Sequence, residues 1–202
     1  MTDSFNTYFP STAAAYCYQL WQQYKFTFRV VRPRRTRLGD FRVLPHNQTQ
    51  ITVNANLNPY AFLITYVHEV AHAAVNSHYK RRVQPHGKAW KTAFQRLMQP
   101  IMTDAVFPET ILEPLQQYMA NPAATTYANP ALMMALRQLD VIEMAATGES
   151  KILLSHVPEG KLFEFAKKTY LRGTLRRTRV VCKEMSSGRS YAILAHAWVE
   201  MK

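Results

Sequence analysis

The chain is organised around the stretch Tyr66-Val67-His68-Glu69-Val70-Ala71-His72-Ala73-Ala74-Val75-Asn76. In a helix, His68 and His72 lie one turn apart on the same face, so both imidazoles can point at one metal ion. Glu69 is one residue further round and can reach a water molecule at the open position of that ion. The spacing therefore predicts a metal site with an acid–base group beside it.

The flanking residues predict a buried helix that carries one polar stripe. Almost every residue between Pro59 and His78 is apolar or small, which is typical of a helix buried on nearly all sides. The polar residues fall on a stripe about 100° wide; they are Thr65, His68, Glu69, His72 and Asn76. The alternative is that this stripe is the solvated edge of a core helix and the histidine spacing is an accident.

A third ligand is expected at His86, because a catalytic zinc ion takes three protein ligands and leaves one position for water. His86 follows His72 beyond one loop and begins the next predicted helix, residues 86–98. The loop lets the chain turn and bring this imidazole to the same ion. On its own, His86 would be interpreted as a core or helix-start residue. The other histidines lack such a context and are expected to be structural or exposed: His46, His78, His156 and His196.

The charge of the chain is unusual and clustered. Its 202 residues carry a net charge of +12, and three stretches, 25–42, 80–91 and 161–189, hold 21 of the 25 lysines and arginines. Such clustering predicts a surface for a polyanion such as nucleic acid. A basic solvated face without a partner is the alternative.

Several protein classes are not expected. The N-terminus lacks a positive region followed by an apolar run, so no secretory signal is predicted. No stretch approaches the roughly 18 apolar residues of a membrane span. Cys17 and Cys182 lie far apart in the sequence, which favours neither a disulfide framework nor a cysteine-based zinc site. We expect a cytoplasmic protein without membrane association.

The remaining patterns predict an α+β fold. Helices are expected at residues 11–24, 59–78, 86–98, 109–119 and 130–144, with a three-stranded sheet from 26–31, 37–44 and 49–54. Residues 121–129 are the expected linker. Short strands follow at 152–157, 161–165, 169–171, 175–182, 189–194 and 198–201 and predict a small antiparallel sheet.

With these motifs in view, the chain resembles the SprT-like (Spartan-related) zinc metalloprotease family. The resemblance rests on His68-Glu69-x-x-His72, on His86-Gly87-x-x-Trp90 and on Arg37-Leu38-Gly39. It implies a helical, zincin-like metalloprotease core in residues 1–120, with one Zn²⁺ per chain held by His68, His72 and His86 and with Glu69 as general base. It also implies a protease associated with DNA.

The resemblance is weaker beyond the core. Residues 121–150 are expected to form a linker and a helix, and residues 151–202 a β-rich subdomain similar to the four-cysteine zinc ribbon of many relatives. This tail retains only Cys182, so a second zinc ion is not expected. Its basic and aromatic residues suit contact with a nucleic-acid backbone and its bases, and the candidates are Arg172, Arg176, Arg177, Arg179 and Tyr191. Aromatic residues at strand spacing can equally belong to a core.

The sequence therefore predicts a zinc-dependent endopeptidase that cleaves proteins, in particular proteins associated with DNA. Two alternatives stay open. The chain could be a nucleic-acid-binding module with a structural or vestigial metal site, or a peptidase unrelated to DNA. The sequence does not indicate an oligomeric state.

Overall fold

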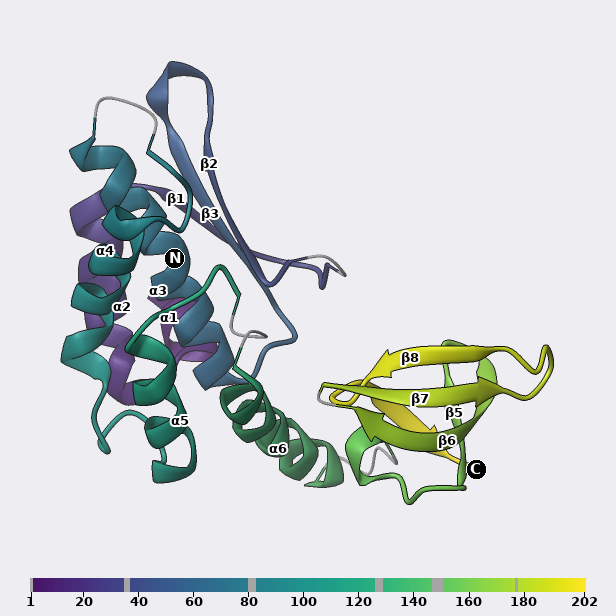
Figure 1. The fold of residues 1–202 in the computed structure, drawn as a ribbon. Coiled ribbons are helices and arrows are strands. Elements are labelled where there is room, and N and C mark those ends of the chain that lie inside the picture. The colour runs from purple at the N-terminus through teal and green to yellow at the C-terminus, as the bar shows by residue number, and fades with distance from the viewer. Residues whose placement is uncertain (1, 35–36, 80–82, 126–128, 147–150, 177) are drawn as a thin grey trace. The chain divides into compact units, whose positions relative to one another are not determined.

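A computed structural model of the protein describes residues 2–34, 37–79, 83–125, 129–146, 151–176 and 178–202. The chain divides into two compact units, Met1–Asn129 and Pro130–Lys202, which are drawn in Figure 1. The described residues form six α-helices, a three-stranded mixed sheet and a six-stranded antiparallel sheet. The expected α+β class is confirmed. The predicted division into a protease core (1–120), a linker with a helix (121–150) and a β-rich subdomain (151–202) stays a prediction.

Helix α3 (Pro59–His78) is the central element of the N-terminal unit. Asn58 caps it by accepting a hydrogen bond from the Ala61 N–H at 2.9 Å, and Pro59 occupies the first turn, a combination that favours a helix start. The helix is buried along most of its length, and its predicted bounds are confirmed. Helices α2 (Ser11–Tyr24) and α4 (Lys88–Met98) pack against it, and α5 (Glu109–Met119) follows in the chain.

Helix α1 (Thr2–Tyr8) was not predicted. Seven residues are too few to show a helical period, and aromatic packing holds this helix in place. Phe5 lies edge-on to Tyr66 of α3, with ring centroids 6.1 Å apart, and Phe9 lies edge-on to Phe62 at 5.0 Å. The N-terminal unit thus anchors its start on the same helix that carries His68 and His72.

The three-stranded sheet has the order β1-β3-β2, with β1 (Thr27–Val31) parallel and β2 (Gly39–Val43) antiparallel to β3 (Thr49–Asn54). A short 3₁₀ turn, η1 (Pro45–Asn47), connects β2 to β3. Ile51 and Val53 of β3 are fully buried, and α3 packs against both β2 and β3. Figure 1 shows the helices of this unit gathered on one side of the sheet. Strand β2 is therefore the edge strand next to α3.

The C-terminal unit begins with helix α6 (Pro130–Ala146). Six strands follow in the spatial order β4-β9-β5-β6-β7-β8, all paired antiparallel. Their bounds are β4 Lys151–Leu153, β5 Leu162–Phe165, β6 Lys168–Arg176, β7 Arg179–Glu184, β8 Ser190–Leu194 and β9 Trp198–Met201. A cluster that includes Leu154, Phe163, Val180, Cys182 and Val199 fills the core. The antiparallel sheet was predicted correctly.

The predicted strand at residues 175–182 was wrong. Strand β6 continues to Arg176, and β7 begins at Arg179 and pairs back on it, with Leu175 opposite Val180. The tip of this hairpin contains neither glycine nor proline, so the sequence carries no turn signal there. The predicted strand at 152–157 was also too long, because β4 ends at Leu153 and a 3₁₀ turn, η4 (Leu154–His156), follows.

Of the helices that the structure describes, none combines the length and the apolar character needed to cross a membrane.

Candidate metal centre

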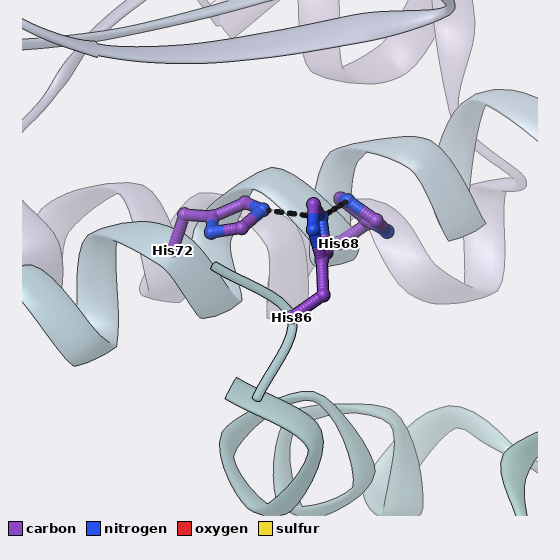
Figure 2. A group of neighbouring side chains, drawn as sticks. All are labelled: His68, His72 and His86. Atoms are coloured by element: carbon purple, nitrogen blue, oxygen red, sulfur yellow. Dashed lines mark hydrogen bonds between the residues drawn. The ribbon is translucent and has the colours of Figure 1, made fainter. Parts of the chain in front are cut away.

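The three predicted metal ligands converge. His68 and His72 project from α3 one turn apart, and His86 lies in the turn before α4 (Figure 2). The Nε2 atom of His86 is 3.1 Å from Nε2 of His68 and 3.0 Å from Nε2 of His72. All three potential ligand atoms lie within 4.8 Å of one another. The group can therefore hold one metal ion.

The spacing of the three nitrogens fits zinc. With Zn–N bonds of about 2.0–2.1 Å in a tetrahedral site, two ligand nitrogens lie roughly 3.3 Å apart, close to the two Nε2 separations. Hydrogen bonding alone does not explain the cluster, because a neutral ring nitrogen is either a donor or an acceptor and His86 Nε2 faces two partners. Three imidazoles are also one of the ligand sets of catalytic zinc sites.

The backbone at His86 is specialised for its position. Its φ of 57° lies in the left-handed region, which costs energy in a non-glycine residue and is concentrated at functional sites. The Gly87 N–H donates to the Gln84 carbonyl at 3.1 Å and closes a tight turn. Helix α4 begins at Lys88, so the prediction that His86 starts the helix was wrong. The turn aims the imidazole back toward α3.

Trp90 packs against all three imidazoles. Its ring centroid lies 4.6 Å from that of His68, 4.7 Å from that of His86 and 5.5 Å from that of His72. Its indole N–H donates to the His68 carbonyl at 3.3 Å, and the side chain is only 1% exposed. One buried side chain thus fixes the rings contributed by two different elements.

The electrostatics keep the imidazoles neutral. Burial, followed by the neighbouring His72 and His86, lowers the pKa of His68 to about 3. Burial and His86 lower the pKa of His72 to about 4, and burial also lowers the pKa of His86. A neutral imidazole has a free lone pair, which metal binding requires. The three side chains are ready to act as ligands at neutral pH.

Glu69 is buried beside this cluster, with 7% of its surface exposed. Burial, followed by the negative charge of Asp40, raises its pKa to about 8, although Arg34 and a hydrogen bond from the Phe41 backbone N–H oppose the shift. A carboxyl group whose pKa lies near neutrality can both accept and donate a proton. Its environment is therefore suited to acid–base chemistry.

Strand β2 holds the Glu69 side chain through contacts that were not predicted. A Cβ atom added at Gly39 would lie 2.6 Å from Glu69 Oε1 and 2.7 Å from Thr65 Cγ2, closer than such atoms approach. Gly39 therefore makes room for the carboxylate. Phe41 donates its N–H to that carboxylate and stacks its ring on His72, with centroids 6.2 Å apart. A glycine within a strand pattern was the available signal, since it often marks a close approach.

Four of the five tail residues predicted to contact nucleic acid are described, and Arg177 lies outside the described residues. Arg172 and Tyr191 flank the buried Cys182 across three strands and share its face of the sheet. Arg172 pairs with Glu159 at 3.1 Å, and its side chain is only 11% exposed. Tyr191 hydrogen-bonds to Glu184. Both side chains thus have partners within the unit.

The other two described arginines lie elsewhere in the sheet. Arg176 is directly opposite Arg179, which neighbours the buried Val180 along β7 and so points to the other face. The four residues therefore do not form one surface. Their contact with nucleic acid stays a prediction.

Comparison with known proteins gives one match. A family model described as the SprT-like family matches residues 5–111, more than half of the chain, and this segment contains the three histidines, Glu69 and strand β2. No curated protein and no solved structure matches the chain. The match covers the candidate metal centre and leaves the C-terminal unit outside it.

Proposed function

The chain belongs to the SprT-like family and carries a metalloprotease-like domain, and we propose that it is a zinc-dependent endopeptidase. In this proposal His68, His72 and His86 hold one Zn²⁺ per chain, and Glu69 is the general base. The observation that carries the proposal is the convergence of three neutral imidazole nitrogens next to a buried glutamate whose pKa is raised to about 8.

The proposed chemistry divides between the metal and Glu69. When bound, zinc supplies Lewis-acid chemistry by polarising the scissile carbonyl and lowering the pKa of water to roughly 7. Glu69 takes the proton of the attacking water at its carboxylate and later delivers it to the leaving amine. Gly39 and the Phe41 N–H keep that carboxylate in place. The bond that breaks is the amide C–N bond, and the water oxygen remains on the new carboxylate.

Strand β2 supports an extended peptide as the substrate. Asn54 donates to the Leu38 carbonyl and Leu44 to the Gln48 carbonyl, so residues 38 and 44 are hydrogen-bonded positions of the antiparallel pair. The alternating residues Gly39, Phe41 and Val43 then direct their backbone groups away from β3. The Phe41 N–H on that edge already donates to Glu69, but no described strand covers the other backbone groups there. An open edge pairs readily with a substrate strand.

We also propose that the substrates include proteins associated with DNA. The support is the net charge of +12 and its three basic stretches, which would raise the local concentration of the enzyme on a polyanion. A cytoplasmic location likewise stays a prediction.

The test is cleavage of a basic DNA-binding protein by the zinc-loaded full chain, with and without DNA. We expect Glu69→Gln to lower the cleavage rate by roughly 10²–10⁴-fold with zinc still bound. Glu184→Gln changes the other buried glutamate whose pKa is strongly shifted and should leave the cleavage rate unchanged. Cleavage by Glu69→Gln at the wild-type rate would contradict the mechanism. Tight DNA binding without cleavage under any metal would favour a nucleic-acid-binding module instead.

A further inference from the structure

A second feature of the N-terminal unit is a pocket of about 670 Å³ along α4 and the C-terminal half of α3. None of the four residues proposed for zinc chemistry lines it. Its polar and aromatic wall is formed by Tyr24, His78, Tyr79, Lys88, Thr92 and Arg96; we call this feature the α3–α4 groove. Its volume lies within the range of about 300–1,000 Å³ typical of ligand pockets.

The charge of the groove favours an anion. Lys88, Thr92 and Arg96 occupy successive turns of α4 and are exposed. None of the described lining residues is aspartate or glutamate. At a rise of 1.5 Å per residue, Lys88 and Arg96 lie roughly 12 Å apart along the helix. That distance is too large for both cations to hold one phosphate, so the row suits several phosphates along an extended chain.

The aromatic residues indicate what lies between the phosphates. Tyr79 is 46% exposed, and the His78 ring lies edge-on to it with the centroids 5.0 Å apart. At the other end, the Tyr24 hydroxyl accepts a hydrogen bond from Arg96 at 3.4 Å. Exposed flat rings beside cations are the surface on which unpaired bases stack.

We propose that the α3–α4 groove binds single-stranded nucleic acid, with Lys88 and Arg96 on the phosphates and Tyr79 stacked on a base. A duplex does not fit this chemistry, because its bases are already stacked and paired. An acidic peptide would use the cations but would leave Tyr79 without a role. The inference extends the proposed association with DNA and is independent of the peptidase chemistry, because the two sites share no residue.

The test is fluorescence anisotropy with oligothymidylate or oligouridylate of about 12 nucleotides and the full-length Glu69→Gln chain, which prevents cleavage from interfering. We expect Lys88→Gln/Arg96→Gln to reduce the slope of log K against log salt by about 1.4, because each phosphate contact on a single strand contributes about 0.7. Tyr79→Ala should weaken binding at least about fivefold with an unchanged slope. The control Arg137→Gln/Lys202→Gln removes the same charge from positions outside both the groove and the three basic stretches and should not change the slope.

Three outcomes would overturn the proposal. If the groove variant and the control reduced the salt slope equally, binding would depend on diffuse charge alone. If polyglutamate displaced the oligonucleotide as well as an unlabelled oligonucleotide does, and Tyr79→Ala did not change this, the ligand would be an acidic peptide. If free thymidine monophosphate saturated the groove at the same concentration as the oligonucleotide does, the groove would be a mononucleotide site. Comparison of the two oligonucleotides distinguishes DNA from RNA, and zinc-dependent cleavage by the wild-type chain, measured separately, tests the proposed function.

Discussion

Glu69 in the N-terminal unit and Glu184 in the C-terminal unit are both buried, with 7% and 2% exposure, yet their pKa values move in opposite directions. Glu184 pairs with Lys168 at 2.8 Å and accepts hydrogen bonds from Ser186 and Ser187 at 2.9 and 3.0 Å, and these partners lower its pKa to about 2. Burial and Asp40 instead raise the pKa of Glu69 to about 8.

The comparison separates a structural carboxylate from a reactive one. Glu184 is held as an anion by its partners and has no reason to accept a proton at neutral pH. Glu69 is buried with little to compensate its charge, in a unit that also points three neutral imidazoles at one another. Such an arrangement costs stability in the absence of a ligand and is typical of functional sites.

The largest expected effect is on the pH dependence of stability in the metal-free chain. The folded-state pKa of Glu69 is raised from 4.5 to about 8, so its stabilising contribution is present below pH 4.5 and is lost as the pH rises through 8. Relative to wild type, Glu69→Gln should therefore gain on the order of 4 kcal/mol between pH 5 and pH 8.5. Hydrogen exchange of α3 peptides measures the gain.

Glu184→Gln is the matched control, and its stability relative to wild type should change with pH in the opposite direction. The folded-state pKa of Glu184 is lowered from 4.5 to about 2, so its contribution is present above pH 4.5 and is lost as the pH falls through 2. In Glu184→Gln, β7 peptides should be less protected from hydrogen exchange than in wild type at neutral pH, and this difference should disappear in acid. If both variants shifted in the same direction, the contrast between the two glutamates would be wrong.

The next effect concerns Trp90, which contacts every imidazole of the site. Trp90→Ala should destabilise the N-terminal unit by about 3–5 kcal/mol and weaken zinc binding, and Trp90→Phe should keep the fold with a smaller loss of zinc affinity. Phe163→Ala removes a fully buried ring from the C-terminal unit and should leave zinc binding unchanged. Equal zinc affinity in wild type and both Trp90 variants would show that Trp90 does not position the ligands.

The smallest expected effect is that of Gly39→Ala. The added methyl group overlaps Glu69 Oε1 and Thr65 Cγ2, so the carboxylate must move while the imidazoles stay in place. We expect kcat to fall by roughly tenfold to a hundredfold, since small displacements of catalytic groups are costly, with one zinc ion still bound. Gly173→Ala, which meets the Val181 carbonyl in the C-terminal unit, should leave kcat unchanged. Wild-type kcat in Gly39→Ala would show that the close contact does not position Glu69.

Capping residues and hydrophobic spacing were sufficient to predict the helices and strands whose ends depend on neighbouring residues. Helix α3 was predicted at both ends because Asn58-Pro59 starts it and its apolar residues continue to His78. The sheet and the three-histidine group also followed from spacing. The start of α4 was wrong by two residues, because the left-handed backbone of His86 serves the site rather than the helix.

The contributions of β2 could not be predicted in the same way. The approach of Gly39 to Glu69 joins residues from separate elements, and no periodicity encodes it. The β6–β7 hairpin was missed because its tip lacks a glycine or proline signal. The opposite environments of Glu69 and Glu184 likewise depend on tertiary partners, since both side chains are alike in the sequence.

The most direct test of the central claim is the zinc content of the purified full chain, measured by mass spectrometry for wild type, His86→Ala and His78→Ala. Of the two substituted histidines, His86 has its Nε2 atom within 3.1 Å of those of His68 and His72, whereas His78 is exposed at the end of α3. We predict one zinc ion per chain in wild type and His78→Ala and loss of that zinc ion in His86→Ala. Full zinc occupancy in His86→Ala would contradict a site built from these three imidazoles.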